Sequence, residues 1–344
     1  MKRVLAVAVV IFLITLLLAF CGDAISAGSQ AQQSEPSSAV SQPRGDLSTP
    51  DGDSKVEKVQ PTAPQTDTSA ESVAAVAEYN DAAGRIISEF FSPDSAPQHF
   101  GKIYMKNSTG QAIDIEQELT QRPKLSLSLD GTPEVLILHT HATESYMLQA
   151  RDYFTEADAV RSQDSSVNMV RVGQAMAQRL EENGIGVIHD TTLHDAVSYT
   201  GSYDRSLETA EALLQKYPSI QVILDLHRDS ISRGEDKLKT VCEVGGRNAA
   251  QLMVVLGCED GSAPAHPNWR ENLRFALRYQ QALEMMYPGL ARPLSVVAHR
   301  YNQHLAPGAM LIELGTEANT LEEAIYTAQL AGDTLARVLK LTAE

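Results

Sequence analysis

Short apolar runs alternate with segments of helical periodicity from residue 134 to the C-terminus. Runs such as VLIL at 135–138 and QVIL at 221–224 have the length and composition of buried strands. The expected strands are residues 135–141, 186–190, 221–229, 250–257 and 309–315, and the expected helices are residues 167–184, 202–217, 268–290 and 320–342. Strands that alternate with helices through short connections predict the α/β fold class, with a mostly parallel sheet and helices on both faces.

The first residues have the pattern of a membrane anchor. Lys2 and Arg3 precede 18 apolar residues from Val4 to Cys21, which is near the length of a spanning helix. We interpret residues 1–23 as an uncleaved transmembrane anchor; a cleaved signal and a lipoprotein signal are the alternatives. The two cations are expected to keep the N-terminus in the cytoplasm, so the rest of a single-pass protein lies outside the cell membrane.

Two segments connect this anchor to the main domain. Residues 24–70 are rich in Ser, Gln and Pro and poor in large apolar side chains, which predicts a disordered linker. Residues 71–133 are expected to be a lead-in segment that begins with a helix. The residues near helical spacing are Val73, Val76, Tyr79, Ile86 and Phe90. The main domain is then residues 134–344.

Charge and cysteine content narrow the possible functions. The chain has 28 Lys and Arg against 44 Asp and Glu, a net charge of −16, and it has no basic stripe. This balance argues against a nucleic-acid partner, because no surface would neutralise phosphates. Outside the apolar N-terminal run, the cysteines are Cys242 and Cys258, neither in a CxxC motif. A disulfide and two buried thiols both remain open.

Polar side chains gather at the predicted strand ends. His139, His141 and Glu144 follow the first strand, His227 closes another, and Glu313 lies within a third. The carboxyl ends of parallel strands meet at one edge of a sheet, and residues two apart on a strand share a face, so His139 and His141 would point together if their strand continued. Two histidines and a carboxylate with an open position form a catalytic zinc site. A polar network without metal, or histidines that cap strands, are the alternatives.

The motifs resemble, in order, those of the stage II sporulation protein P family. They are HTHATESY at 139–146, VIHDTTLHDAVSYTGSYDRS at 187–206, DLHRDS at 225–230, GGRNAAQLMVVLG at 245–257, YNQHLAPGAMLIELG at 301–315 and Asn319. The anchor and linker match the family's layout as well. The resemblance implies a zinc amidase-like fold and a membrane-anchored hydrolase that cleaves the amide between muramic acid and L-alanine in peptidoglycan. Stem-peptide crosslinks are a further candidate bond.

The same resemblance implies a cellular role and a partner. It implies septal wall degradation and engulfment during endospore formation, beside a glycan-cleaving partner like stage II sporulation protein D. Two other functions stay open from the residues alone. One is a non-catalytic cell-wall-binding module, and the other is a zinc metallopeptidase of different specificity.

Residue roles follow from the resemblance one position at a time. It implies that His141 and His227 bind Zn²⁺ and that Glu313 is the catalytic base and proton donor. Related amidases take a glutamate ligand from the start of the next helix, where this chain has Asn168. Glu144 is the first candidate for the third ligand, and His139 is the second.

Four further residues are expected around the metal or in the substrate groove. They are Asp225, Arg228, Asp229 and Asn302. The carboxylates could orient a histidine ligand through its second ring nitrogen. Packing, turn or capping roles are the alternatives.

Overall fold

The computed structural model describes residues 82–343 except 159 and 260–264. The predicted anchor at 1–23, the linker at 24–70 and the first part of the lead-in segment lie outside these residues. None of the helices in the described part combines the length and the apolarity that a bilayer crossing requires.

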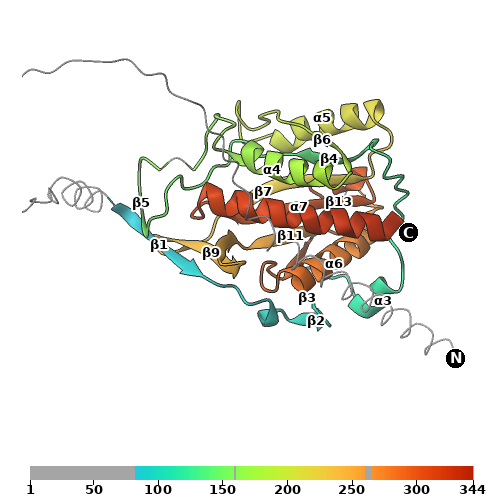
Figure 1. Cartoon of the computed structure of the whole chain (residues 1–344), viewed down its shortest axis with the longest axis horizontal. Coiled ribbons are helices and arrows are strands. Elements are labelled where there is room, and N and C mark those ends of the chain that lie inside the picture. Colours follow the sequence, from blue (N-terminus) through green and yellow to red (C-terminus); the bar gives the residue numbers. More distant parts are fainter. Residues whose placement is uncertain (1–81, 159, 260–264, 344) are drawn as a thin grey trace, which may run out of the picture. The chain divides into compact units, whose positions relative to one another are not determined.

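An eight-stranded sheet forms the centre of the fold, in the order β2-β3-β12-β11-β13-β7-β4-β6 (Figure 1). Its strands are β2 (Gln98–Phe100), β3 (Ile103–Asn107), β4 (Pro133–Leu138), β6 (Gly186–His189), β7 (Val222–Asp229), β11 (Leu252–Gly257), β12 (Leu294–Val297) and β13 (Gly308–Thr316). Strands β13, β7, β4 and β6 are parallel to one another, as are β3, β12 and β11; the two sets meet antiparallel at β11 and β13. The predicted α/β class with a mostly parallel sheet is confirmed.

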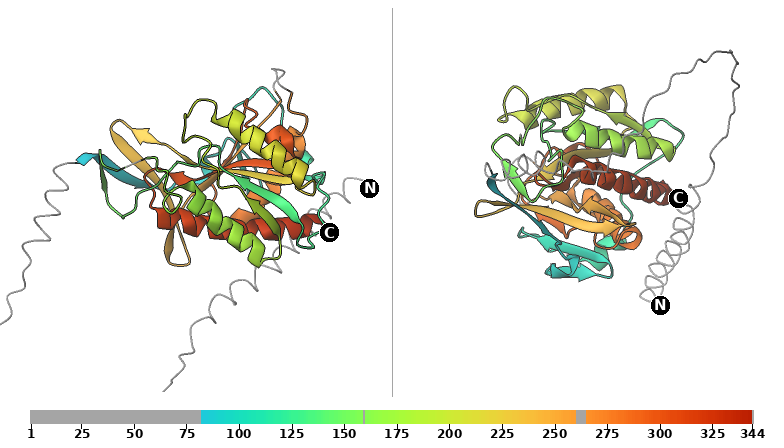
Figure 2. Two further views of the ribbon diagram at one scale, coloured as in Figure 1. Left: turned by 90° about the horizontal axis from the view of Figure 1, so that it is seen from above. Right: turned by 60° about the vertical axis from the view of Figure 1, so that its left-hand side comes forward.

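Helices cover both faces of this sheet, as predicted. Val135 of β4 packs in one large cluster with helices α4 (Met169–Glu182), α6 (Trp269–Met286) and α7 (Leu321–Ala343). The next residue, Leu136, packs on the opposite face with Ala210 of α5 (Ser202–Lys216), which follows from the two-residue period of a strand. Figure 2 shows α5 on one side of the sheet and α4 and α7 on the other. Glu313, near the end of β13 on the α5 face, is only partly buried.

A second, smaller sheet overturns one prediction. Residues 82–89, expected to continue a helix, form strand β1 (Ala82–Glu89). This sheet has the order β10-β9-β1-β5, with β8 paired to β9. Its other strands are β5 (Tyr153–Thr155), β8 (Ser232–Arg233), β9 (Asp236–Val244) and β10 (Arg247–Ala250).

The helix prediction fails here because pairing partners distant in sequence override local periodicity. Ile86 is buried in a cluster with Met147 and Ala318, which one strand face can present. Gly84 lies so close to the backbone that an added Cβ would be 2.5 Å from the Glu235 carbonyl oxygen. Both features follow from strand pairing of β1 with β9 and β5.

The remaining predicted elements are present with small shifts at their ends. The strand expected over 135–141 ends at Leu138 as β4, before the histidine motif. The predicted lead-in segment supplies β2, β3 and α3 (Ile115–Leu119), and a short 3-10 helix η2 (Gln303–Leu305) precedes β13. Cys242 and Cys258 are free thiols, which settles the disulfide alternative.

Candidate active site

The histidine motif leaves the strand, and its two histidines separate. Strand β4 stops at Leu138 and a turn follows, so the strand does not continue through the histidine motif. His139 and His141 therefore do not point to one face. His139 is fully buried; its Nδ1 lies 3.3 Å from the Leu226 carbonyl oxygen, and its Nε2 lies 2.9 Å from His189 Nε2. Both ring nitrogens of His139 therefore have protein partners, whereas the Glu144 carboxylate lies beside His227.

The structure brings the other predicted residues together at the carboxyl ends of β4, β7 and β13. The rings of His141 and His227 are perpendicular, with centroids 5.3 Å apart. Glu144 Oε2 lies 3.7 Å from His227 Nδ1. Glu313 pairs in register with His227 across β13 and β7, so both side chains point to the α5 face. Two imidazoles and two carboxylates thus converge on one place.

An aspartate lies beside each of the two histidines. Asp225 Oδ1 is 2.9 Å from His227 Nε2, without the alignment of a hydrogen bond. Asp195 Oδ2 is 3.9 Å from His141 Nδ1. Ser202 Oγ lies within hydrogen-bond distance of His141 Nδ1, at 3.4 Å, so Nε2 is the candidate ligand atom of that ring. His227 Nε2 has no hydrogen-bond partner, so both nitrogens of this ring are candidate ligand atoms.

Asp195 and its partner Arg161 have no predicted role, and both lie in loops without periodic signal. Asp195 accepts hydrogen bonds from Thr143 Oγ1 at 2.6 Å and from Arg161 Nη1 at 2.5 Å. Arg161 Nη2 also lies 3.6 Å from Glu144 Oε1. Asp195 and Arg161 therefore join the turn that bears His141 to the carboxylate of Glu144.

The pKa values of His141, His227 and Glu313 are shifted strongly from their usual values. Burial by itself would lower the pKa of His227, but the Asp225 and Glu144 carboxylates raise it to about 10. Burial and the neighbouring His227 charge lower the pKa of His141 to about 4. Burial raises the pKa of Glu313 to about 8, although His227 acts in the opposite direction. Such opposed shifts among neighbouring groups are characteristic of acid-base chemistry.

Glu144 is fixed beside the start of α4, although it precedes that helix in the chain. The Met169 amide donates to the Glu144 carbonyl oxygen at 2.8 Å, and the Arg228 amide donates to Glu144 Oε2 at 3.1 Å. Asn168 caps α4 by accepting from the Val170 amide at 3.0 Å. The residue at the expected ligand position thus has a structural role, and a carboxylate reaches the same neighbourhood from the preceding turn.

Arg228 and Asp229 lie in the surrounding shell. Arg228 is buried, and its Nη2 donates to the Val160 carbonyl oxygen at 2.8 Å. Asp229 accepts from Arg292 Nη2 at 2.8 Å. Both residues therefore connect the end of β7 to neighbouring loops.

Aromatic rings form one wall of the site. Tyr199 stacks on His141 with ring centroids 4.3 Å apart, and Tyr203 meets His141 edge-on at 5.7 Å. Tyr301 faces Tyr203 at 5.8 Å. Although Tyr199 touches a buried histidine, 61% of its surface is exposed, so it lies at the mouth of the site.

A strained turn positions the Tyr301 end of this wall. Tyr301 and Asn302 have φ values of 48° and 58°, in the left-handed region that non-glycine residues rarely occupy. Asn302 Nδ2 donates to the Tyr203 carbonyl oxygen at 2.9 Å and lies 3.2 Å from Ser206 Oγ. The Asn302 side chain thereby attaches this turn to α5.

The donor chemistry of the site fits zinc. Across 82–343, outside the gaps, no three His, Cys, Asp or Glu side chains already form a group that could hold a metal ion. His141, His227 and Glu144 nevertheless provide the nitrogen and oxygen donors that zinc accepts. Glu313 Oε2 is buried without a hydrogen-bond partner, so a carboxylate oxygen faces this centre uncompensated.

Comparisons with known proteins agree with the motifs. A family model for stage II sporulation protein P matches residues 29–340. Stage II sporulation protein P of Bacillus subtilis (strain 168) is 31% identical over 210 residues, which cover 58% of this chain and 49% of that protein. The chain thus spans about half the length of this curated relative.

Solved structures of amidases resemble the chain remotely. AmiC2, an N-acetylmuramoyl-L-alanine amidase of Nostoc punctiforme, is 13% identical and has a TM-score of 0.37, covering 62% of this chain and 97% of its own. The CwlD amidase of Clostridioides difficile, solved in complex with the GerS lipoprotein, is 11% identical with a TM-score of 0.36, covering 61% and 95%. At such low identity and TM-score, these likenesses give no information about activity.

Proposed function

Because the chain belongs to the stage II sporulation protein P family, we propose that it is a zinc-dependent peptidoglycan hydrolase. Its proposed reaction is cleavage of the amide between muramic acid and L-alanine. The observation that supports this most directly is the convergence of His141, His227, Glu144 and Glu313 on one sheet edge. A wall-binding module without catalysis would not need two histidines and two carboxylates gathered at one end of the sheet.

In this proposal, His141, His227 and Glu144 would hold the ion. When bound, zinc would polarise the scissile carbonyl and increase the acidity of the attacking water. Asp195, 3.9 Å from His141, and Asp225, 2.9 Å from His227, place a negative charge beside each of the two imidazole rings.

Glu313 moves the proton. Its carboxylate accepts a proton from the water that attacks the carbonyl carbon, and it then donates this proton to the nitrogen of the departing L-alanine. Burial supports this role, because it raises the pKa of Glu313 to about 8 and brings proton exchange near neutral pH. Glu313 is only partly buried, which would allow a substrate to reach it.

Where the reaction takes place is also part of the proposal. The chain would be anchored in the cell membrane by residues 1–23 and act outside it on septal peptidoglycan during endospore formation. A glycan-cleaving partner like stage II sporulation protein D would act on the same wall. The family of the chain and the composition of its first 70 residues support this placement.

A single digestion experiment separates the candidate activities. The full chain, loaded with zinc, would digest purified peptidoglycan, and mass spectrometry would identify the products. Amidase activity releases stem peptides that begin with L-alanine and leaves glycan without peptide. Shortened crosslinks would indicate a metallopeptidase of different specificity, and unchanged peptidoglycan with stoichiometric zinc would refute the proposed reaction. The Glu313→Gln variant serves as the matched inactive control.

A further inference from the structure

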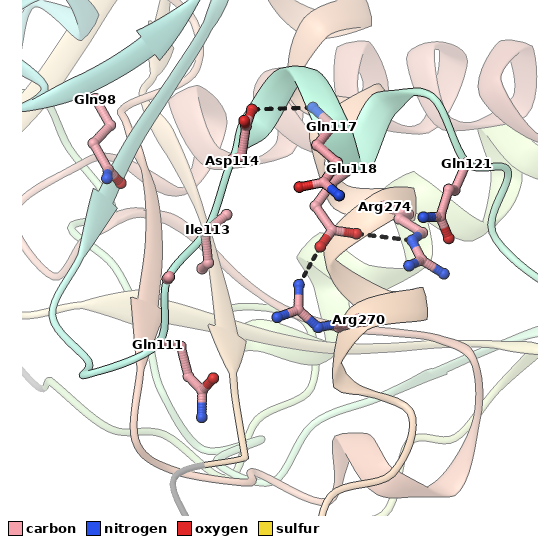
Figure 3. A pocket seen from close by; sticks show the side chains of 10 residues that line it. Gln98, Gln111, Ile113, Asp114, Gln117, Glu118, Gln121, Arg270 and Arg274 are labelled. Carbon is pink, nitrogen blue, oxygen red and sulfur yellow. Dashed lines mark hydrogen bonds and ion pairs between the residues drawn. The ribbon is translucent and has the colours of Figure 1, made fainter.

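A polar pocket of about 590 Å³ lies between β2, α3 and the first turns of α6 (Figure 3). Its polar lining includes Gln98, Gln111, Asp114, Gln117 and Gln121. The volume is within the range of about 300–1,000 Å³ that small-molecule sites occupy. No residue of this lining belongs to the candidate active site.

The pocket lies at the other end of the sheet from the active site. Strand β3 runs parallel to β12 and β11, and β11 is antiparallel to β13. The segment after Asn107, which includes Gln111 and Asp114, therefore leaves the sheet at the end where β13 begins with Gly308. The catalytic groups lie at the end where β13 and β7 finish.

Three charged residues of the pocket, Glu118, Arg270 and Arg274, are paired with one another. The fourth, Asp114, is exposed and caps α3 by accepting a hydrogen bond from the Gln117 amide at 3.1 Å. Glu118 is 6% exposed, and it accepts hydrogen bonds from Arg270 Nη1 and, at 2.9 Å, from Arg274 Nε. Arg274 Nη1 also donates to Glu271 Oε1 at 2.7 Å. Figure 3 shows Glu118 between the two arginines. Because both arginines are paired with Glu118, the lining does not favour a strongly anionic ligand.

Carboxamides dominate what the pocket offers to a ligand. Gln98 Oε1 is buried without a hydrogen-bond partner, while Gln117 and Gln121 are exposed at the rim. Each carboxamide both donates and accepts, as do the hydroxyl and acetamido groups of an amino sugar. Ala112 and Ile113 are the apolar residues of the lining.

We propose that this pocket binds an N-acetylated hexosamine of a glycan strand. The inference rests on the proposed function, and it adds a second point of attachment to peptidoglycan, away from the bond that is cut. A strand held at this pocket raises the effective concentration of its stem peptides at the active site.

Binding of a peptide-free sugar tests the pocket separately from hydrolysis. The full chain would be titrated with N,N′,N″-triacetylchitotriose, and binding would be followed by saturation-transfer NMR. The double variant Gln98→Leu, Gln117→Leu removes two carboxamides at nearly constant size. We expect it to bind the sugar about tenfold more weakly, the size expected for one or two lost hydrogen bonds. Gln178→Leu, an exposed glutamine on α4, is the matched control and should bind normally.

The remaining arms identify where the sugar binds and whether the ligand is a sugar. The His227→Ala variant should keep sugar binding, since His227 is outside the pocket. Sugar binding that is lost in His227→Ala but kept in the double variant would place the sugar in the active site and overturn the proposal. Absence of sugar binding to the unmodified chain would also overturn it, as would displacement of the sugar by free stem peptide in the His227→Ala variant.

A hydrolysis readout adds the functional consequence, and thermal unfolding of each variant verifies that it is folded. The double variant should raise the KM for whole peptidoglycan sacculi and leave cleavage of a soluble muropeptide unchanged. Equal losses on both substrates would contradict a separate attachment site. Failure of all hydrolysis, with sugar binding intact, would instead count against the proposed function alone.

Discussion

Glu313 of β13 lies beside His227 of β7 in the parallel register, and the two side chains point to the same face of the sheet. Parallel neighbours end at the same edge, so the strand that carries the proposed base also ends beside a proposed metal ligand. His141 reaches the same edge from the turn after β4. The proposed chemistry therefore depends on three adjacent strands, which fix the separation of these groups better than flexible loops would.

Glu313→Gln should abolish most hydrolysis without loss of zinc. Glutamine keeps the size of the side chain but cannot accept the proton, and loss of a general base costs about 10² to 10⁴ in rate. Turnover and bound zinc would be measured on the same sample. Retained turnover would show that another group carries the proton.

Glu144→Gln should instead lose zinc together with activity, because a neutral amide oxygen is a poor zinc ligand. The Glu144 carboxylate is buried beside His227 and the Arg228 amide, so its loss also changes the charge on His227. Metal analysis after dialysis measures the effect. Zinc that is lost from Glu313→Gln but retained in Glu144→Gln would reverse the two assignments.

Asp195→Asn should weaken zinc binding by about 10- to 100-fold, the usual effect of changing the partner of a metal-binding histidine. The substitution keeps the shape of the side chain but removes the charge that lies beside His141 and Arg161. A competition titration with a chelator measures the affinity. Asp130→Asn, an exposed turn carboxylate bonded to Thr132, is the control and should not change it.

Asn302→Ala should destabilise the fold by about 1–3 kcal/mol, because it loses hydrogen bonds to α5 and keeps the left-handed backbone. Asn302→Gly loses the same bonds, but glycine adopts this backbone freely, so it should cost less. Urea unfolding of both variants gives the difference. Equal costs would mean that the φ of 58° at Asn302 carries no strain.

The pair of His139 and His189 should make the protein less stable in acid. Burial lowers the pKa of His139 from 6.5 to about 3 and the pKa of His189 to about 4. The unfolded chain therefore binds protons at a higher pH than the folded chain does. The contribution to stability is complete above pH 6.5 and is lost as the pH falls through 4 toward 3.

The measurement compares the free energy of unfolding at pH 7 and pH 5. His189→Gln removes one of the titrating groups, and the difference between the two pH values should shrink by about 1–2 kcal/mol. Each protein serves as its own reference, so a general loss of stability in the variant does not affect the comparison. An unchanged difference would mean that His189 does not titrate between the folded and unfolded states as described.

Local sequence signals identified the elements whose burial is regular. Strands β7 and β13 are apolar runs, and helices α4 to α7 have one apolar side, so their positions follow from periodicity. Strand β1 could not be found this way, because its pairing with β9 and β5 joins segments far apart in the chain. The apolar residues around it have near-helical spacing, so the sequence predicted a helix where the structure has a strand.

The residues of the candidate site likewise fall into those that the strand pattern predicts and those that it does not. His141, His227 and Glu313 stand out because polar groups at the ends of apolar strands have few structural reasons to be there. Asp195 and Arg161 approach His141 and Glu144 from loops, whose course is set by tertiary contacts. The different directions of His139 and His141 depended on where β4 ends, a boundary that periodicity does not locate to one residue.

Because β11 and β13 are antiparallel, strands of this sheet finish at both of its ends, and loops follow at each end. One end bears the proposed catalytic groups, and the other bears the loop after β3 with its carboxamide pocket. Substitutions in the loops of one end leave the other end's residues in place. During evolution, the proposed glycan pocket can therefore change independently of the proposed catalytic groups.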